Sequence, residues 1–576
     1  MNKELLSIAC KEKPAELLLA NARIVNVFTG RVQEGNVAIA GGRIAGVGDY
    51  RQAEEVLDLE GKYLLPGLLD GHVHLESSLL HPREYARAVV PRGVLGVVTD
   101  LHEIANVCGL EGIRWVLACA EKLPLDIFIM APSCVPATNL ETSGAVVDLA
   151  ELEAMLDWPQ VIGLGEVMNY PGVVRGETKL LEKIRLFRGR PIDGHAPGLR
   201  GEDLNAYLAA GIFSDHECTA LEEAREKLSR GMWLMIREGT SAKNLEALLP
   251  LVDDRTYGRC FFVVDDRSCA DLLQDGDVDG VVRKAIGLGL DPVRAIRLAT
   301  LNPAEYFRLA GLGAIAPGYW ANLMVVDDLS SLQAKLVFYR GKLVAQEGQP
   351  IFEEPGIETW PQVSQTVRVK PVDIEALRIP VRGETFPVIE VIPGQILTRR
   401  RDERVREVEG FIEPDPERDI LKLVVVERHK ASGNIGRGLV RGFGLKRGAL
   451  ASSVAHDSHN LVAVGADDRD ILQAIKELER LQGGLVVVAG GKVISSLPLP
   501  LAGLLSNEPL KTVAEKLARL EQAASDLGCS LPSPFSVLSF LALPVIPELR
   551  LTDQGLVDVT SFKILEGASS DPYRKE

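Results

Sequence analysis

The sequence predicts an α/β protein, namely a (β/α)8 TIM-like barrel with a small β-sandwich domain formed from both flanks and a C-terminal α+β domain. Three observations support this prediction. Eight apolar runs alternate with amphipathic stretches between residues 64 and 315, which is typical of a parallel α/β fold. Short strand-like segments precede this region and return after it. Beyond residue 360 the chain first becomes polar and Pro-containing, and then becomes rich in strands again.

The first flank, residues 16–60, consists of short strand-like segments separated by turns, ELLLANARIVNVF, TGRVQEG and NVAIAGGRIAGVG. Segments of the same character follow much later, in ANLMVVDD at 321–328 and KLVFYRGKLVAQEG at 335–348. Alternating apolar residues bounded by turn residues predict strands. We therefore expect residues 1–63 plus 316–360 to form one small domain around an inserted domain.

The inserted domain, residues 64–315, contains the eight strand candidates. They lie at 68–75, 94–103, 126–134, 161–169, 191–198, 212–217, 232–239 and 260–268. Eight parallel strands with their helices close a barrel of about 250 residues, which matches the length of this segment. Periodicity alone leaves the closure of the barrel open.

Residues 361–576 form the third predicted unit. The segments LKLVVVERH (421–429) and LVVVAGGKVISSL (485–497) predict strands, and LKTVAEKLARLEQAASDL (510–527) predicts a helix. The composition indicates a separate α+β domain and gives no indication of its function.

The overall composition argues against several classes of protein. Hydrophobic residues make up 46% and charged residues 25% of the chain, which is the balance of a soluble globular protein. The formal net charge of −16 argues against a general affinity for nucleic acids or anionic membranes. We find neither a signal-peptide pattern nor an apolar run of the roughly eighteen residues that a membrane span needs. The eight cysteines include no CxxC pair, so we expect reduced thiols and a cytoplasmic location.

Two histidines lie two positions apart at the end of the first predicted strand. His72 and His74 occur in DGHVHLESS, and alternate residues of a strand point to the same side. Both imidazoles can then face the barrel mouth and bind one metal ion. Two surface or capped histidines are the alternative for the pair taken alone.

Further candidate ligands end other predicted strands. Glu166 follows VIGLG, His195 follows PIDG, His216 follows IFSD, and Asp265 follows CFFVV. The carboxyl ends of barrel strands converge on one mouth, so we expect these residues to meet the HxH pair there. Four imidazoles and two carboxylates suit a two-metal site in which one carboxylate bridges both ions. A buried polar group without a metal is the alternative for each residue taken singly.

These residues, together with several loops, resemble the amidohydrolase superfamily and, within it, the adenine deaminases. PGLLDGHVHLESS is similar to the opening signature of the superfamily, and the order HxH, acid, His, His, Asp matches its ligand plan. Many members bridge the metals with a carboxylated lysine, where this chain has Glu166. The resemblance to adenine deaminases lies in Glu166 and in LHEIANV (101–107), PSCVPAT (132–138), GLGEVMNYPGV (163–173), DGHAPGL (193–199), DDRS (265–268) and VAHDSHNLVAVGADD (454–468).

The resemblance implies the hydrolysis of adenine to hypoxanthine and ammonia in purine salvage, with two divalent metal ions as cofactors, Mn or Fe, and Zn as the alternative. It implies that one ion is held by His72, His74, Glu166 and Asp265, and the other by Glu166, His195 and His216. The partners that we expect are the small molecule adenine and further copies of this chain in a homo-oligomer of open subunit number, with no nucleic acid and no membrane.

Proton transfer needs further groups at the same mouth. Asp265 is the expected general base and acid, with the adjacent Asp266 as the alternative for the strand-eight acid. Glu103 can serve as a second acid toward a ring nitrogen if burial raises its pKa. We expect contacts to the substrate from His102, Glu103, Arg237 and Asp266, and similarly from Glu238. The alternative is that these residues are exposed to solvent or support other residues of the site.

Two features stand apart from this plan. Leu101 occupies a position where the resemblance leads us to expect Pro, which puts the shape of that loop in question. The C-terminal residues His456, Asp457, His459 and Asn460 form a polar cluster that can either reach the barrel mouth or make a local turn network.

Two other functions remain open at this stage. A cyclic amide hydrolase of the dihydroorotase or hydantoinase kind would share the ligands and differ in the pocket. A catalytically inactive barrel acting as a binding protein would be expected to lack some ligands, and here none is missing. The P-C-x-x-C motif of the cytidine deaminase type of zinc site does not occur.

Overall fold

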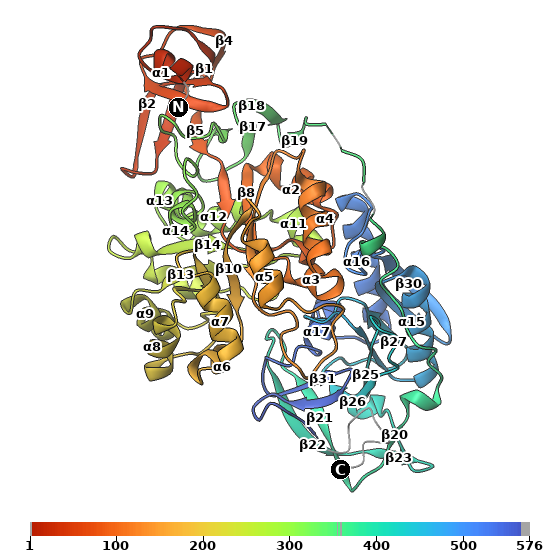
Figure 1. Cartoon of the computed structure of the whole chain (residues 1–576). Helices are drawn as coiled ribbons and strands as arrows, with labels where there is room; N and C mark the ends of the chain where they lie inside the picture. The colour runs from red at the N-terminus through yellow and green to blue at the C-terminus, as the bar shows by residue number, and fades with distance from the viewer. Residues whose placement is uncertain (1–2, 354, 358–359, 566–576) are drawn as a thin grey trace.

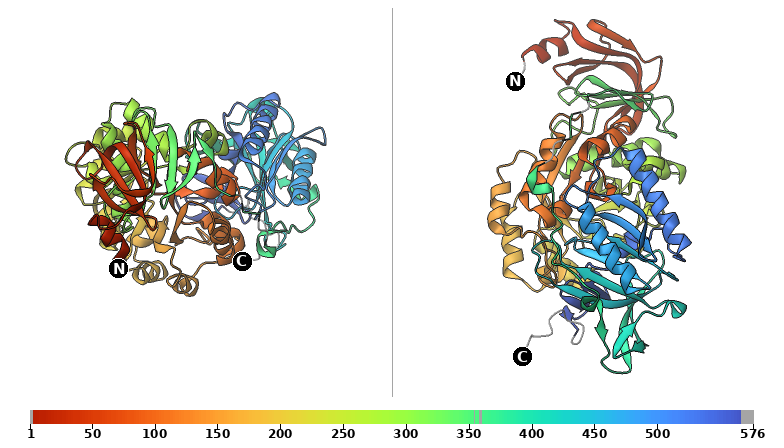
Figure 2. Two further views of the ribbon diagram at one scale, coloured as in Figure 1. Left: turned by 90° about the horizontal axis from the view of Figure 1, so that it is seen from above. Right: turned by 90° about the vertical axis from the view of Figure 1, so that its right-hand side faces the viewer.

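The computed structural model of the chain describes residues 3–353, 355–357 and 360–565 (Figure 1). It contains a nine-stranded sheet at one end, a barrel in the middle and a C-terminal α/β unit packed along the barrel (Figures 1 and 2). This architecture confirms the predicted fold class. Within these described residues no helix is both long and apolar enough to cross a membrane.

The nine-stranded sheet combines strands from both flanks of the barrel. Its strands are β1 (Ala15–Asn26), β2 (Arg31–Ala40), β3 (Arg43–Gly48), β4 (Ala53–Asp58), β5 (Tyr63–Pro66), β16 (Leu323–Val326), β17 (Ala334–Tyr339), β18 (Lys342–Gln346) and β19 (Gln349–Pro350). The helix α1 (Lys3–Ala9) packs against β2 and β3. β5 pairs with β1 on one side and with β16 on the other, so the flanks meet there. Leu19, Ile39, Leu323 and Phe338 lie in one buried cluster, and the two flanks therefore share a core.

The barrel is built from the eight strand regions that the sequence indicates. They are β6 (Leu68–Asp70) with β7 (Val73–His74), β8 (Val94–Thr99), β9 (Asp126–Pro132), β10 (Val161–Val167), β11 (Ile192–Gly194), β12 (Ser214–Asp215), β13 (Trp233–Arg237), and β14 (Cys260–Val263) with β15 (Asp265–Asp266). Parallel pairing runs from β6 to β11 and from β12 to β14. β15 pairs with β7, which joins the eighth strand to the first. Between β11 and β12 the amide of Gly194 donates to Ser214 Oγ.

Helices alternate with these strands around the barrel. They are α2 (Pro82–Val89), α3 (His102–Cys108), α4 (Leu110–Ala120), α5 (Leu149–Met155), α6 (Tyr170–Val174), α7 (Thr178–Leu186), α8 (Gly201–Ala209), α9 (Leu221–Ser229), α10 (Leu245–Leu248), α11 (Cys269–Gln274), α12 (Val278–Gly287), α13 (Pro292–Leu298) and α14 (Leu301–Tyr306). In α12 the buried Val278, Val281, Val282 and Ala285 recur with the helical period, which places one apolar stripe against the barrel.

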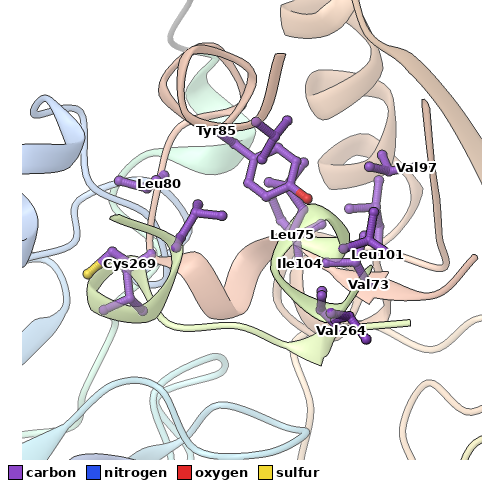
Figure 3. Close-up of a cluster of buried hydrophobic side chains, with 14 of the residues drawn as sticks. Val73, Leu75, Leu80, Tyr85, Val97, Leu101, Ile104, Val264 and Cys269 are labelled. Atoms are coloured by element: carbon purple, nitrogen blue, oxygen red, sulfur yellow. The ribbon is translucent and has the colours of Figure 1, made fainter. Parts of the chain in front are cut away.

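An apolar cluster includes side chains of the first, second and eighth strand regions of the barrel (Figure 3). Val73 points into this cluster, so the alternation along the strand turns its neighbours His72 and His74 toward the mouth. Leu101 also packs into the cluster, with a backbone φ of 53°. Proline is locked near a φ of about −65° and cannot adopt that conformation. The loop before α3 therefore has a shape that Pro at position 101 would not allow.

In its described residues the C-terminal unit consists of one eight-stranded sheet, two three-stranded sheets and three α-helices. Its strands are β20 (Ile379–Pro380), β21 (Thr385–Val391), β22 (Thr398–Arg404), β23 (Arg406–Val408), β24 (Phe411–Glu413), β25 (Leu421–Val426), β26 (Ile435–Arg441), β27 (Ala449–Ser452), β28 (Leu461–Gly465), β29 (Gly484–Ala489), β30 (Lys492–Pro498), β31 (Leu549–Thr552), β32 (Gly555–Asp558) and β33 (Lys563–Ile564). Its helices are α15 (Asp468–Leu481), α16 (Leu510–Asp526) and α17 (Pro534–Phe540).

The C-terminal unit and the barrel are in close contact. α16 packs against α11 and α2 of the barrel. One buried apolar cluster continues from the barrel into the C-terminal sheet, with Val73 and Tyr85 on one side and Leu450 and Val487 on the other. The two units therefore share a core. The domain limits at residues 63, 315 and 360 stay a prediction.

Candidate active site

The six residues expected as metal ligands lie together at the carboxyl end of the barrel. His74, Glu166 and Asp265 are within β7, β10 and β15, and His72, His195 and His216 directly adjoin β7, β11 and β12. All of these side chains are buried except that of His195, which is 16% exposed. The strand ends thus bring together residues that are far apart in the sequence.

The carboxylate of Glu166 lies between two sets of histidines. Its Oε1 is 3.4 Å from His74 Nε2. Its Oε2 is 2.8 Å from His195 Nδ1 and 3.0 Å from His216 Nε2. Each oxygen therefore faces a different part of the cluster, which is the arrangement that a carboxylate shared by two cations requires.

Asp265 faces the HxH pair from the eighth strand. Its Oδ1 is 3.0 Å from His74 Nε2 and 3.7 Å from His72 Nε2. The ring of His72 also stacks on that of His216, with 4.3 Å between the ring centroids. The HxH pair therefore contacts Asp265 of the eighth strand and, through the ring of His72, His216 after β12.

The chemistry of these donors fits divalent metal ions. Burial lowers the pKa of His72 to about 3, so its imidazole is neutral, and its buried Nε2 has no hydrogen-bond partner among the described residues. Burial alone would raise the pKa of Glu166, but His216 and His195 hold it well below its usual range. A neutral imidazole and an ionised carboxylate are the forms that bind metals. Neighbouring carboxylates raise the pKa values of His74, His195 and His216 despite burial, so metal binding would displace protons from these three rings.

Buried contacts hold the histidines that follow β11 and β12. The hydroxyl of Tyr207 donates to the carbonyl of Val167 at 2.8 Å and accepts from the amide of His195 at 3.2 Å. Asp215 accepts from the Ala196 amide at 2.8 Å and also pairs with the fully buried Lys227. These contacts fix the ends of both strands from outside the site.

Asp100 and Glu217 belong to the site and were missed by the sequence analysis. Asp100 Oδ2 is 2.9 Å from His102 Nδ1, and its Oδ1 is 3.5 Å from His74 Nδ1. Glu217 Oε1 is 3.4 Å from His216 Nε2. Asp100 directly follows β8, so the rule that identified Glu166 and Asp265 also indicates Asp100. Asp100 contacts the ring nitrogen of His74 that faces away from Glu166 and Asp265, the position from which a carboxylate orients a histidine ligand.

Arg237 binds the acidic residues around it. Its Nε is 2.6 Å from Asp265 Oδ2, its Nη2 is 3.3 Å from Asp266 Oδ2, and its Nη1 pairs with Glu217. Burial would raise the pKa of Asp265, but Arg237 and His74 keep it well below the usual range. Asp266 accepts a hydrogen bond of 2.5 Å from Ser77 Oγ. Of the two adjacent acids, Asp265 is the one within 4 Å of both histidines of the HxH pair.

Glu238 is turned away from the site. Its carboxylate pairs with Lys284 and accepts from the amide of Leu245. It does not line the cavity described below, and it supports the segment that follows β13.

The C-terminal polar cluster reaches the barrel mouth. His456 Nδ1 is 2.7 Å from Glu103 Oε1, and His459 Nε2 pairs with the other oxygen of Glu103. Asp457 Oδ1 lies 3.8 Å from His102 Nε2. Histidines of the C-terminal unit thus hold a carboxylate of the barrel.

These contacts correct the expectation for Glu103. Burial favours a raised pKa, but the two imidazoles His456 and His459 hold the pKa of Glu103 well below its usual range. Glu103 is therefore ionised. Burial raises the pKa of Asp457 to about 6, so this residue carries a proton more readily. Asn460 stays outside the cavity and donates to the carbonyl of Thr142 at 2.8 Å.

A small cavity adjoins these groups. The predicted residues His74, His102, Glu103, Glu166, His195, His216, Arg237, Asp265 and Asp266 line it, together with Met168, Glu217, His456 and Asp457. The remaining lining residues are Ile396, Phe540, Leu543 and Ile546 of the C-terminal unit, which we call the apolar wall. Phe540 ends α17 and stacks on His456, with 4.4 Å between centroids and 17° between planes. The sequence pattern gave no indication that these apolar residues of the C-terminal unit would line the cavity.

Comparisons with known proteins agree with this geometry. The amidohydrolase family model matches residues 63–344, and the model of the adenine deaminase C-terminal domain matches residues 395–563. An adenine deaminase of Dehalococcoides mccartyi is 58% identical over 98% of this chain and 98% of that protein. Adenine deaminase 2 of Carboxydothermus hydrogenoformans is 50% identical over 98% of this chain and 99% of its own. An adenine deaminase of Kosmotoga olearia is 44% identical over 96% of this chain and 97% of that protein. The chain therefore belongs to the adenine deaminase family and to the amidohydrolase superfamily.

Proposed function

We propose that this chain hydrolyses adenine to hypoxanthine and ammonia, as a metal-dependent enzyme of purine salvage. The observation that carries the proposal is the position of Glu166, whose two oxygens face His74 on one side and His195 and His216 on the other. Membership in the adenine deaminase family supports the choice of adenine among the substrates of such a site.

The proposed cofactors are two divalent ions, with Mn or Fe preferred and Zn as the alternative. His72, His74, Glu166 and Asp265 would hold one ion, and Glu166, His195 and His216 the other. When bound, the ions supply Lewis-acid activation of the attacking water near neutral pH. Mixed imidazole and carboxylate donors accept all three metals, so metal analysis of the purified protein decides among them.

Asp265 is the proposed general base and acid. It is held ionised beside Arg237, so it can accept a proton from water as oxygen attacks C6 of the base. The same proton can then pass to the exocyclic nitrogen, which leaves as ammonia when the C6–N bond breaks. The second proton of the water is lost as the C6 carbonyl forms, and it replaces the proton given to the ring nitrogen. Asp266, which pairs with Ser77 and Arg237, is proposed to contact substrate.

Protonation of a ring nitrogen makes C6 more reactive, and two residues near His102 are suited to handle this proton. Asp457, with its raised pKa, is the proposed donor. Glu103, which His456 and His459 keep ionised, is proposed to accept a hydrogen bond from a ring N–H. His102 and Arg237 would make further polar contacts with the substrate. The flat faces of the base would pack against the apolar wall.

We further propose that the enzyme works in the cytoplasm and as a homo-oligomer. The scattered cysteines without CxxC pairs support a reducing location. Light scattering of the purified protein measures the subunit number.

The function is tested by ammonia release from adenine and adenosine, and by ring opening of hydantoin to its N-carbamoyl amino acid, after reconstitution with Mn, Fe or Zn. We expect turnover of adenine with at least one metal and none after chelation. Turnover of hydantoin in place of adenine would instead assign the chain to the cyclic amide hydrolases. Full metal occupancy without turnover of any substrate would favour a binding protein.

A further inference from the structure

A second and larger cavity lies at the opposite end of the barrel from the candidate active site. Its lining includes Phe213 directly before β12, Trp233 at the start of β13 and Arg259 directly before β14. These are the amino ends of strands whose carboxyl ends carry the active-site residues. The two cavities have no lining residue in common.

Five arginines line this cavity, and we call it the arginine cleft. They are Arg185, Arg188, Arg190, Arg259 and Arg308. Within the described part of the chain, none of them forms an ion pair with a carboxylate. Arg190 and Arg308 instead donate to backbone carbonyls, and Arg259 lies over the ring of Trp233.

The uncompensated charge is local and is not a property of the whole surface. The chain has a net charge of −16, yet the lining of this cleft contains five arginines and a single carboxylate residue, Glu305. Glu305 lines the arginine cleft but is 3.6 Å from Arg297, which lies outside it. Guanidinium groups gathered in a concave surface focus a positive potential and attract anions. Phosphate oxygens match their planar donor geometry.

Aromatic side chains line the same cleft. Trp233 and Tyr306 lie 5.4 Å apart between ring centroids. Arg259 is 5.2 Å from the centroid of Trp233. Phe213 is 50% exposed, which is unusual for a large apolar residue beside charged groups. Flat apolar rings next to guanidinium groups can stack on a heterocyclic base while the arginines hold its phosphates.

We propose that the arginine cleft binds a nucleoside phosphate, with the phosphates on the arginines and the base on the aromatic side chains. The proposed ligand is a small molecule and is distinct from the substrate in the active-site cavity. Binding in the cleft does not depend on which reaction the active site catalyses.

Calorimetric titration of the metal-loaded protein tests the proposal with GDP, pyrophosphate and guanosine as probes. We expect GDP to bind at least 10-fold more tightly than either of the other two, because only GDP engages both parts of the cleft. Affinity should fall as salt is raised, since exposed charges are screened. Equal binding of pyrophosphate and GDP would reduce the cleft to a simple anion site and overturn the proposal. So would the absence of GDP binding at millimolar concentration.

Paired variants locate the binding. The double variant Arg188→Ala/Arg259→Ala should weaken GDP binding at least 10-fold. Both residues are exposed, so this variant should fold. The matched control is Arg225→Ala with Arg399→Ala, two exposed arginines outside the cleft, which should stay within 2-fold of the wild type. Saturating hypoxanthine should leave the GDP affinity unchanged. Loss of GDP binding in the presence of hypoxanthine, or unchanged binding in the cleft variant, would contradict the inference.

Discussion

Individual residues at the strand ends determine the chemistry that the active site can support. Glu166 offers one oxygen to His74 and the other to His195 and His216, while Asp265 faces the HxH pair from the opposite strand. The two acids therefore differ in environment. Glu166 is surrounded by imidazoles, whereas Asp265 also pairs with the guanidinium of Arg237.

Removing a histidine donor should remove metal. We expect His72→Ala, His195→Ala and His216→Ala each to lose bound metal and nearly all activity while the barrel stays folded, because the three side chains adjoin strand ends and do not pack within strand interiors. Elemental analysis together with circular dichroism measures both effects. Full metal occupancy in all three variants would contradict the two-metal assignment.

The two acids should respond differently to neutralisation. Glu166→Gln should lose metal more severely than Asp265→Asn, because a neutral amide bridges two cations poorly. Asp265→Asn should lower kcat by about 100-fold or more, the usual contribution of a general acid or base. Metal content and kcat are measured on the same preparations. Normal turnover in Asp265→Asn would transfer the proton-transfer role to Asp266.

Glu103 is expected to act on substrate and not on metal. Glu103→Gln should impair turnover of adenine and leave bound metal intact. It also leaves the buried His456 and His459 without their anionic partner, and breaking a buried pair in this way costs about 3–5 kcal/mol. Thermal unfolding should therefore shift downward together with kcat/KM. Loss of metal in this variant would show that Glu103 supports the ligands.

Most of these residues could be predicted because they obey a rule of the fold. Strand ends of a barrel converge, so Glu166, His195, His216 and Asp265 could be grouped from the sequence pattern alone. Asp100 obeys the same rule and was overlooked. The pKa of Glu103 could not be predicted, because its partners His456 and His459 lie in another unit of the chain and no spacing relates them.

The elements of the molecule explain how these side chains are presented. Alternation along β7 sends Val73 into the apolar cluster and the flanking histidines into the mouth (Figure 3). The pairing of β15 with β7 closes the barrel at the point where Asp265 meets the HxH pair. Pattern analysis located all eight strand regions, although several of the strands are only two to four residues long.

The helix α17 supplies the largest side chain of the apolar wall. Phe540→Leu should raise the KM for adenine by about 10-fold and leave metal content unchanged, since aromatic contacts to a base contribute about 1–3 kcal/mol. The control is Phe535→Leu, a buried phenylalanine on the same helix that does not line the cavity. A KM increase of equal size in both variants would indicate a purely structural role for Phe540.

At the scale of the whole molecule, the active site is shared between the barrel and the C-terminal unit. The barrel provides the metal-binding residues, and the C-terminal unit provides His456, Asp457 and the apolar wall. The sequence predicted both units as folds. It could not predict their contact, because the core that joins them is made of apolar residues with no pattern of their own in the sequence.

This shared site leads to an expectation about substrate size. The apolar wall and the polar groups around Glu103 both line one small cavity, which suits a free base whose ring nitrogens meet polar partners. A ribose on N9 would have to displace some of these lining side chains. We therefore expect strong discrimination between the free base and its nucleoside.

The ratio of kcat/KM for adenine to kcat/KM for adenosine, measured on the metal-loaded enzyme, tests this expectation. We predict a ratio of at least about 100-fold in favour of adenine, because a missing or unpaired buried contact costs about 1–3 kcal/mol and a displaced wall adds to that cost. Comparable values for the two substrates would contradict the assignment of free adenine as the substrate, although membership in the amidohydrolase superfamily would stand.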